Sequence, residues 1–239
     1  MIKNILLDLD DTIFDFKRAE REALLKMIES FGVKAGDDAA ERYSAINKWH
    51  WKQLELGHMT RSEVLSRRFE VFIKEEGFDI PPEKAREKYE GNLGRGHYYM
   101  PGAHEALMRL KPSYRIYLVS NGTARVQYGR IRSSDIEEYL EGIFISQEIG
   151  FNKPDRRFFE IVAERIPGYK KEETVIIGDS LSSDIRGGVN SGIVSIWYNP
   201  RFKANDTLDG DSPVRPDLEL NAWEDIERVL LSIQDPGLT

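Results

Sequence analysis

Short apolar runs that end in polar, turn-forming residues recur towards both ends of the chain. This pattern predicts β-strands near residues 5–7, 115–120, 142–146, 174–178 and 193–197, with a weaker one near 218–220. Apolar residues at helical spacing lie between the later runs and predict helices near 103–111, 123–133, 155–165, 182–191 and 222–233. Strands that alternate with helices in this way indicate an α/β fold with a Rossmann-like, doubly wound parallel sheet.

Residues 16–97 differ from the rest, because they show helical periodicity and no convincing strand. Asp15 can cap a first helix, and Thr60 with Glu63 forms a capping box for a third. The residues that end the first three helices are Gly32, Gly57 and Gly77, and Pro81-Pro82 opens a fourth. Four helices are more than an ordinary strand-to-strand crossover contains. We therefore predict a helical domain over 16–97, inserted into a core formed by residues 1–15 and 98–239.

Three polar stretches outside the strands carry further predictions. Asn221 and Glu224 indicate a second capping box, ahead of the last helix. Residues 200–216 are rich in Asp, Pro and Gly, which predicts a surface loop. The glycine-rich stretch 91–96 looks like a phosphate-binding loop, but no strand precedes it, and we interpret it as a hinge.

Composition narrows the class of protein. The 239 residues carry a net charge of −7 with a pI of about 5.3, which argues against nucleic-acid polymers and anionic membranes as partners. A small anionic substrate stays compatible with this charge, because a local cation can offset it. The chain has no cysteine, its first residues do not form a signal peptide, and no apolar run is long enough to span a membrane. These features predict a cytoplasmic protein.

The first strand is followed directly by Asp8-Leu9-Asp10-Asp11-Thr12. Because strand side chains alternate, Asp8 and Asp10 are expected on one side and Leu9 on the other. Two crowded carboxylates are costly without a cation or a shared proton. A solvated acidic turn would also explain this stretch taken alone. An EF-hand calcium loop would not, because Ile13 stands where that loop requires glycine.

Three later strands end in polar loops of their own. These loops contain Ser120-Asn121-Gly122, Lys153-Pro154-Asp155 and the segment from Gly178 to Asp184. Loops that follow parallel strands gather at the carboxyl edge of the sheet, so we expect Asp8, Asp10, Asp179 and Asp184 to converge there. Clustered carboxylates suit a hard divalent cation such as Mg²⁺. For Asp184, an anion that complements a helix dipole is an alternative.

In residue type, order and strand context, these four stretches resemble the DxDxT, Ser/Thr, Lys and GDxxxD motifs of the haloacid dehalogenase-like (HAD) hydrolase superfamily. The resemblance implies a phosphatase in which Asp8 attacks phosphorus and forms an aspartyl phosphate. Asp10 would protonate the leaving oxygen and then deprotonate the attacking water. The phosphoryl oxygens would be held by Ser120, the backbone amide of Asn121 and Lys153, and the Thr12 hydroxyl would support the loop.

The same resemblance implies a metal site and a cap. Asp8, the backbone carbonyl of Asp10 and Asp179 would bind Mg²⁺, with Asp184 contributing directly or through water. Haloacid dehalogenases lack an aspartate at the position of Asp10, so its presence favours phosphoryl transfer. The inserted helical domain corresponds to the cap, which closes over the site and selects the substrate in this superfamily.

Further stretches resemble the bacterial noncanonical pyrimidine nucleotidases over nearly the whole chain, namely Asp15-Phe16, 125–128, 150–154, 165–167 and 177–185. This subgroup removes the 5′-phosphate from pyrimidine nucleoside monophosphates, so the resemblance implies a small phosphate ester as substrate. A broad-specificity or sugar-phosphate HAD phosphatase and a non-catalytic HAD-fold binding protein are the alternatives. The presence of all four motifs argues against a non-catalytic protein.

Overall fold

The computed structural model describes residues 1–203 and 214–234, and the chain forms two compact units. The first contains residues 1–15, 99–124 and 135–239, and the second contains residues 16–98 and 125–134. The second unit therefore takes in residues 125–134, which the sequence-based division assigns to the core. The assignment of the two units as a catalytic core and a cap stays a prediction.

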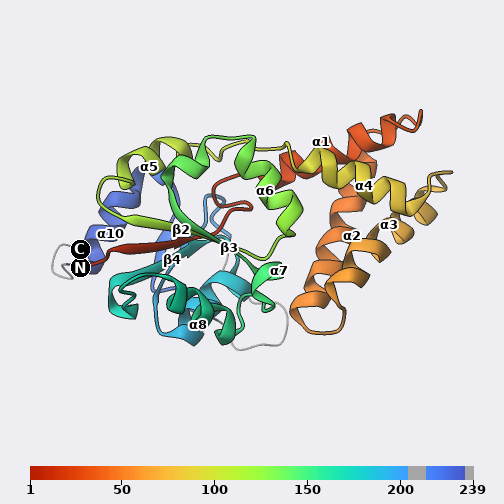
Figure 1. Cartoon of the computed structure of the whole chain (residues 1–239). Helices are drawn as coiled ribbons and strands as arrows, with labels where there is room; N and C mark the ends of the chain where they lie inside the picture. Colours follow the sequence, from red (N-terminus) through yellow and green to blue (C-terminus); the bar gives the residue numbers. More distant parts are fainter. Residues whose placement is uncertain (204–213, 235–239) are drawn as a thin grey trace. The chain divides into compact units, whose positions relative to one another are not determined.

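A parallel sheet of six strands forms the centre of the first unit within its described residues (Figure 1). The strands are β1 (Asn4–Leu7), β2 (Arg115–Ser120), β3 (Leu140–Ile145), β4 (Thr174–Gly178), β5 (Val194–Tyr198) and β6 (Leu218–Leu220). Their order is β3-β2-β1-β4-β5-β6, and every neighbouring pair is parallel. The predicted doubly wound α/β fold is confirmed.

The strand order places the first motif at the middle of the sheet. From β1 the chain moves outward to β2 and β3, and it then returns to β4 on the other side of β1. Ligands of open α/β sheets bind where the winding reverses, beyond the carboxyl ends of the strands. Asp8 follows β1 and Asp179 follows β4, so these two residues flank the reversal.

Helices cover both faces of this sheet. They are α5 (Ala103–Leu110), α7 (Ser146–Ile149), α8 (Arg156–Arg165), α9 (Arg186–Ser191) and α10 (Ile226–Gln234). Figure 1 shows α8 on one face, with α5 and α10 on the other. On the α8 face, Phe158 and Val162 pack with alternate strand residues such as Leu6 and Ile176, all fully or almost fully buried. Each face of the sheet is thus buried against a layer of helices, and this burial of apolar side chains stabilises the positions of the strand ends.

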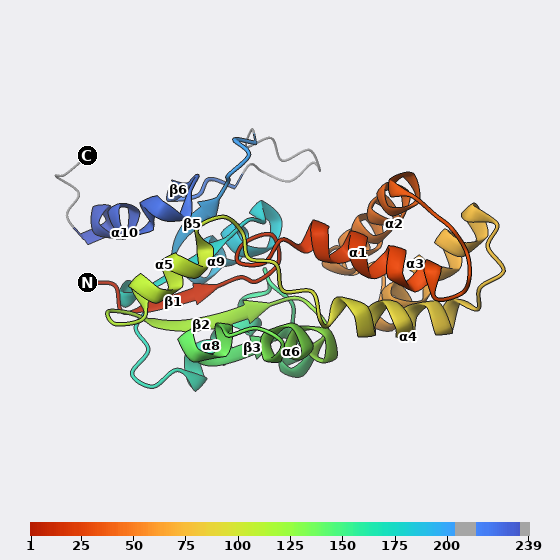
Figure 2. The same ribbon diagram turned by 90° about the horizontal axis from the view of Figure 1, so that it is seen from above.

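The second unit is a bundle of helices with its own apolar core. Its helices are α1 (Phe16–Glu29), α2 (Asp37–Glu55), α3 (Arg61–Glu76), α4 (Pro82–Leu93) and α6 (Ala124–Arg132). α1 lies along α4, and α2 lies along α3 (Figures 1 and 2). The capping box of Thr60 and Glu63 forms as predicted, and Gly77 ends α3 in a left-handed conformation.

A chain of buried polar side chains crosses this bundle. Asn47 on α2 donates to Glu20 on α1 at 2.6 Å and accepts from Arg68 on α3 at 2.8 Å. All three side chains are almost completely buried. Helix α6 joins the same unit through Val126 in the apolar core and through Arg130, whose Nε donates to the Gly96 carbonyl at 2.7 Å.

Several local predictions are wrong or only partly right. No capping box of Asn221 and Glu224 forms, because a 3₁₀ turn (Trp223–Asp225) precedes α10 and the Asn221 amide faces the Asn199 carbonyl instead. The helix predicted over 182–191 begins with a π-helical turn (Leu181–Ile185) before α9. Most of the loop predicted over 200–216 lies outside the described residues. The stretch 91–96 begins inside α4 with no strand before it, which agrees with the rejection of a phosphate-binding loop there, and its role as a hinge stays a prediction.

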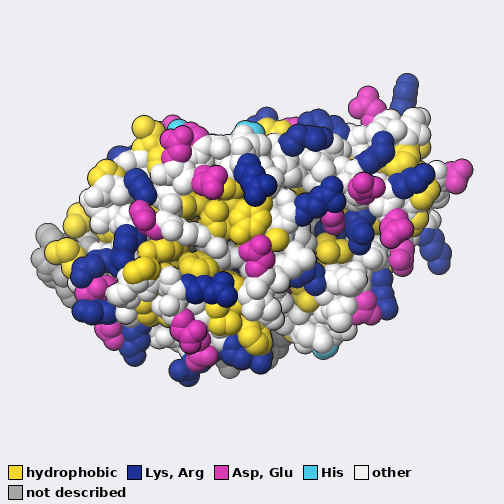
Figure 3. All heavy atoms as spheres, in the orientation of Figure 1, with side chains coloured by type: hydrophobic (Ala, Val, Ile, Leu, Met, Phe, Trp, Pro, Cys, Tyr) yellow, Lys and Arg dark blue, Asp and Glu magenta, His cyan; other side chains and the backbone are white. Residues whose placement is uncertain are grey.

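The surface view supports the inference drawn from net charge. Lys and Arg side chains are interspersed with Asp and Glu over the face in Figure 3, and they do not gather into one basic stripe there. Among the helices of the described residues, none has the length and apolar character needed to cross a membrane.

Candidate active site

The loop after β1 is a tight turn that fixes two of the predicted site residues. The backbone amides of Ile13 and Phe14 both donate to the Leu9 carbonyl, at 3.0 and 2.9 Å. The Thr12 hydroxyl inside this turn donates to Asp8 Oδ2 at 3.2 Å and accepts from the Asp179 amide at 3.1 Å. Thr12 therefore connects the ends of β1 and β4, which fits the supporting role predicted for it.

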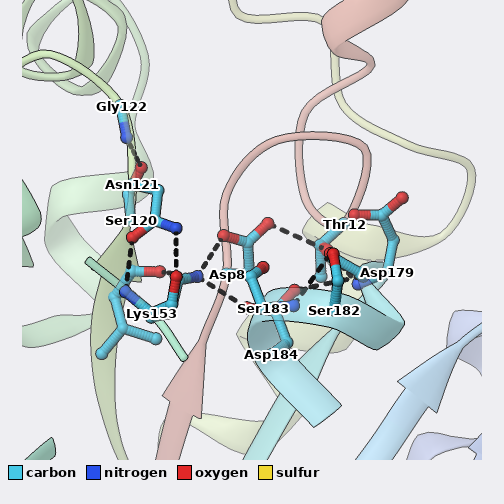
Figure 4. Close-up of polar contacts among 12 residues, drawn as sticks. Asp8, Thr12, Ser120, Asn121, Gly122, Lys153, Asp179, Ser182, Ser183 and Asp184 are labelled. Carbon is cyan, nitrogen blue, oxygen red and sulfur yellow. Dashed lines mark hydrogen bonds and ion pairs between the residues drawn. The ribbon is translucent and has the colours of Figure 1, made fainter. Parts of the chain in front are cut away.

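The ammonium group of Lys153 connects three parts of the site by hydrogen bonds. Its Nζ donates to Asp8 Oδ1 at 2.7 Å, to Asp184 Oδ1 at 2.6 Å and to the Val119 carbonyl at 2.8 Å (Figure 4). An ammonium group has three N–H donors, so these contacts use all of them. The side chain is 1% exposed. In this arrangement Lys153 compensates two buried carboxylates, a role that the sequence did not suggest.

The second motif holds the backbone of the third. The Asn121 side chain donates to the Lys153 carbonyl at 2.9 Å and accepts from the Lys153 amide at 2.8 Å. Ser120 is buried, and its hydroxyl accepts from the Gly122 amide at 3.0 Å. The sequence predicted a part for the Asn121 backbone amide only, whereas its side chain is what orients Lys153.

The fourth motif is shaped by Gly178 and Asp184. A Cβ atom at position 178 would collide with the Asp184 carboxyl group, so only glycine fits there. Asp184 is 1% exposed, and its Oδ2 accepts from the Ser180 amide at 3.1 Å. Both carboxylate oxygens of Asp184 thus have donors, one from Lys153 and one from the backbone of its own loop.

Two tryptophans and a lysine that sequence reasoning missed also border the site. Trp223 donates from its indole to the Thr12 carbonyl at 3.1 Å, and Trp197 donates to the Asp179 carbonyl at 2.9 Å. Lys203 Nζ lies 3.8 Å from Asp179 Oδ2. The tryptophans gave no signal in the sequence, because buried aromatic residues are ordinary core residues.

The carboxylates of the site are electrostatically frustrated. Burial raises the pKa of Asp8 to about 7, while the neighbouring Lys153 lowers it and the charges of Asp184 and Asp10 raise it. Burial and the nearby Asp11, Asp8 and Asp184 raise the pKa of Asp179 well above its usual value. Burial alone would lower the pKa of Lys153, but Asp184 and Asp8 raise it above its ordinary range. One buried ammonium does not satisfy the anions around it.

The donor set fits a divalent cation. One carboxylate oxygen each from Asp8, Asp179 and Asp184 can be chosen so that all lie within 4.8 Å of one another. Hard oxygen donors in such a cluster suit Mg²⁺, and a cation would supply the positive charge that the raised pKa values call for. Asp10 is half-buried in the loop after β1 and is not one of these three carboxylates. Its charge is nevertheless close enough to raise the pKa of Asp8.

Comparison with known proteins identifies the family. Residues 2–192 match the family described as haloacid dehalogenase-like hydrolase. The chain therefore belongs to the haloacid dehalogenase-like hydrolases, as the four motifs predict.

Relatives that match almost the entire chain include two that are more than 30% identical to it. YfnB of Bacillus subtilis, described as a HAD-hydrolase, is 36% identical over 228 residues, which cover 95% of each protein. The pyrimidine 5′-nucleotidase PynA of Streptococcus pneumoniae is 34% identical over 225 residues, or 94% of this chain and 93% of PynA. A crystal structure of YfnB bound to magnesium matches with a TM-score of 0.88 and covers 96% of this chain and 98% of that one.

Proposed function

We propose that this hydrolase is a magnesium-dependent phosphatase that cleaves a small phosphate monoester, with pyrimidine nucleoside 5′-monophosphates as preferred substrates. The observation that carries the proposal is the buried arrangement of Asp8, Lys153 and Asp184 at the carboxyl end of the central strand. It places a carboxylate beside a fixed ammonium at the position where ligands of such sheets bind. The similarity to PynA supports the choice of substrate.

In the proposed mechanism Asp8 is the nucleophile. A carboxylate oxygen of Asp8 forms a bond to phosphorus while the bond from phosphorus to the alcohol oxygen breaks, and Asp10 gives that oxygen its proton. Asp10 then takes a proton from water as the water attacks phosphorus, which releases inorganic phosphate and restores Asp8. Thr12 keeps the Asp8 carboxylate in one orientation through its 3.2 Å hydrogen bond.

Charge compensation in this mechanism comes from Lys153 and from a bound cation. Phosphoryl oxygens that arrive at Asp8 also come next to the Lys153 ammonium, and Ser120 with the Asn121 amide would complete the phosphate site. Mg²⁺ held by Asp8, the Asp10 carbonyl and Asp179, with Asp184 in support, would offset the negative charge of carboxylates and phosphate.

A parallel comparison of substrates tests this proposal. Hydrolysis of uridine, deoxyuridine and thymidine 5′-monophosphate is measured beside the purine nucleotides and a hexose phosphate at one magnesium concentration. We expect kcat/KM to be about tenfold or more higher for the pyrimidines, which corresponds to about one well-made polar contact. Equal rates would leave a broad-specificity phosphatase, and a preference for the hexose phosphate would replace the nucleotidase assignment.

A further inference from the structure

The segment after β5 approaches the acidic cluster in a well-defined turn. The Asn199 amide donates to the Leu220 carbonyl at 2.8 Å, so the turn begins anchored to β6. The Asn199 side chain then accepts from the Lys203 amide at 2.9 Å and donates to the Lys203 carbonyl at 3.0 Å. These two hydrogen bonds close the turn and fix where the Lys203 side chain leaves the backbone.

The turn contains a strained residue that is difficult to explain by packing. Phe202 has a φ of +51°, a left-handed conformation that is unusual for an aromatic residue. The residue is 75% exposed, so burial of the ring does not compensate for the strain. The conformation does allow the chain to curl back so that residue 203 reaches Asn199. Strain of this kind persists where the surrounding structure requires it and is often associated with function.

The consequence of the turn is a cation beside Asp179. Lys203 Nζ lies 3.8 Å from Asp179 Oδ2, and the charge of Lys203 opposes the rise in the pKa of Asp179. The Lys203 side chain is 51% exposed, whereas the Lys153 side chain, which pairs with Asp8 and Asp184, is 1% exposed. Lys153 is therefore a fixed counter-charge, and Lys203 is a counter-charge on a long, hydrated side chain that can be displaced.

We propose that Lys203 is a positioning residue that acts as a built-in competitor for the divalent cation at Asp179. It stabilises the metal-free cluster and lowers the affinity of the cluster for Mg²⁺. The proposal rests on the proposed function only in that the three carboxylates bind a divalent cation. It gives the turn after β5 a part in the site, because the turn determines how tightly the cofactor is held.

Calorimetric titration of the metal-free protein with MgCl₂ at low ionic strength tests this directly. The variants are Lys203→Gln, Lys203→Arg and, as a matched control, Arg201→Gln. Arg201 lies in the same turn and is exposed. Replacing it with Gln removes one positive charge, as Lys203→Gln does. We expect Lys203→Gln to bind Mg²⁺ about fivefold more tightly than wild type, because a unit charge at this distance is worth about a factor of this size even in water. Lys203→Arg and Arg201→Gln should remain within twofold of wild type.

A second readout follows stability without metal. In excess chelator the Tm of Lys203→Gln should fall below that of wild type, and added Mg²⁺ should remove the difference. An unchanged Mg²⁺ affinity in Lys203→Gln, or an equal gain in Arg201→Gln, would overturn the proposal while leaving the phosphatase assignment intact. Wild-type protein that binds no Mg²⁺ would overturn the metal site itself and the proposal with it.

Discussion

Lys153 Nζ lies 2.7 Å from Asp8 Oδ1, although 145 residues separate the two in the sequence. The same ammonium lies 2.6 Å from Asp184, so one buried cation compensates two buried anions. Removing a single partner from such a group leaves uncompensated charge among largely buried side chains, which is more costly than the loss of any one hydrogen bond.

Replacing this lysine should therefore destabilise the fold. In excess chelator at pH 8 we expect Lys153→Met to lower the free energy of unfolding by about 3–5 kcal/mol. Burial raises the pKa of Asp8 in the folded state to about 7 even beside Lys153. A carboxyl with a raised pKa binds a proton more readily in the folded protein, so stability should recover as the pH falls below that value.

Denaturant unfolding at pH 8 and pH 5.5 measures this effect. Lys171→Met is the control, because Lys171 is exposed and its replacement should change stability by no more than about 0.5 kcal/mol. A Lys153→Met protein as stable as wild type at pH 8 would contradict the inferred charge compensation.

The proposed nucleophile can be separated from its neighbours by single substitutions. Asp8→Asn should lower kcat for phosphate ester hydrolysis by about 10³-fold or more, because an amide is neither a nucleophile nor a good cation ligand. Asp10→Asn should also lower kcat strongly, because the amide cannot exchange a proton with the leaving oxygen or the attacking water. Asp11→Asn should be milder, since the left-handed backbone at Asp11, with φ of +56°, suits asparagine and no reacting role is assigned to it. Circular dichroism controls for folding, and equal losses at positions 10 and 11 would contradict this reading of the loop.

Thr12 offers a matched pair of substitutions. Thr12→Val keeps the shape but removes the hydroxyl that donates to Asp8 and accepts from the Asp179 amide. We expect kcat to fall about tenfold, the equivalent of one or two lost hydrogen bonds, while Thr12→Ser keeps most of the activity. Steady-state kinetics on both variants checks this, and a Val variant as active as the Ser variant would show that the hydroxyl does not orient Asp8.

Metal removal should stop turnover. In excess chelator we expect phosphatase activity to disappear, Mg²⁺ to restore it, and Ca²⁺ to restore it poorly. Ca²⁺ accepts more ligands at longer distances, which would misplace the carboxylates relative to the phosphate. Activity assays after dialysis, with each cation added back, measure this. Full activity in chelator would rule out a metal-assisted reaction.

The buried polar chain of the second unit makes a separate prediction about stability. Arg68→Met would leave Asn47 and Glu20 without their buried cationic neighbour, and we expect a loss of about 3 kcal/mol or more. Arg42 in the same unit pairs with Glu76 but is 53% exposed, so Arg42→Met should cost no more than about 1 kcal/mol. Thermal unfolding of both variants compares them. Equal effects would mean that the buried chain adds nothing beyond a surface ion pair.

Sequence periodicity was sufficient to place the four motifs at the strand ends but not to predict which of their side chains pair. The strand ends could be predicted, because apolar runs and parallel topology bring Asp8, Ser120 and Asp179 to one edge whatever the details of packing. The bond from Lys153 to Asp184 could not, since it depends on side-chain directions that no spacing rule contains. Lys203 was missed for a different reason, because it lies in a polar stretch whose composition predicted only a loop.

The domain division shows the same limit. The helix predicted near 123–133 has an amphipathic pattern with one buried face, but such a pattern does not say which neighbour covers that face. In the structure the face of Val126 belongs to the apolar core of the helical unit.

Helix α6 therefore makes the helical unit discontinuous, with consequences for modular engineering. A swap that exchanges residues 16–98 alone would leave Val126 without its core and the Arg130 guanidinium without the Gly96 carbonyl. Grafting a helical unit from a relative would thus require two coordinated segments, the long insertion and residues 125–134. Because the helical unit is predicted to select the substrate, we expect substrate range to be transferable only when both segments are moved together.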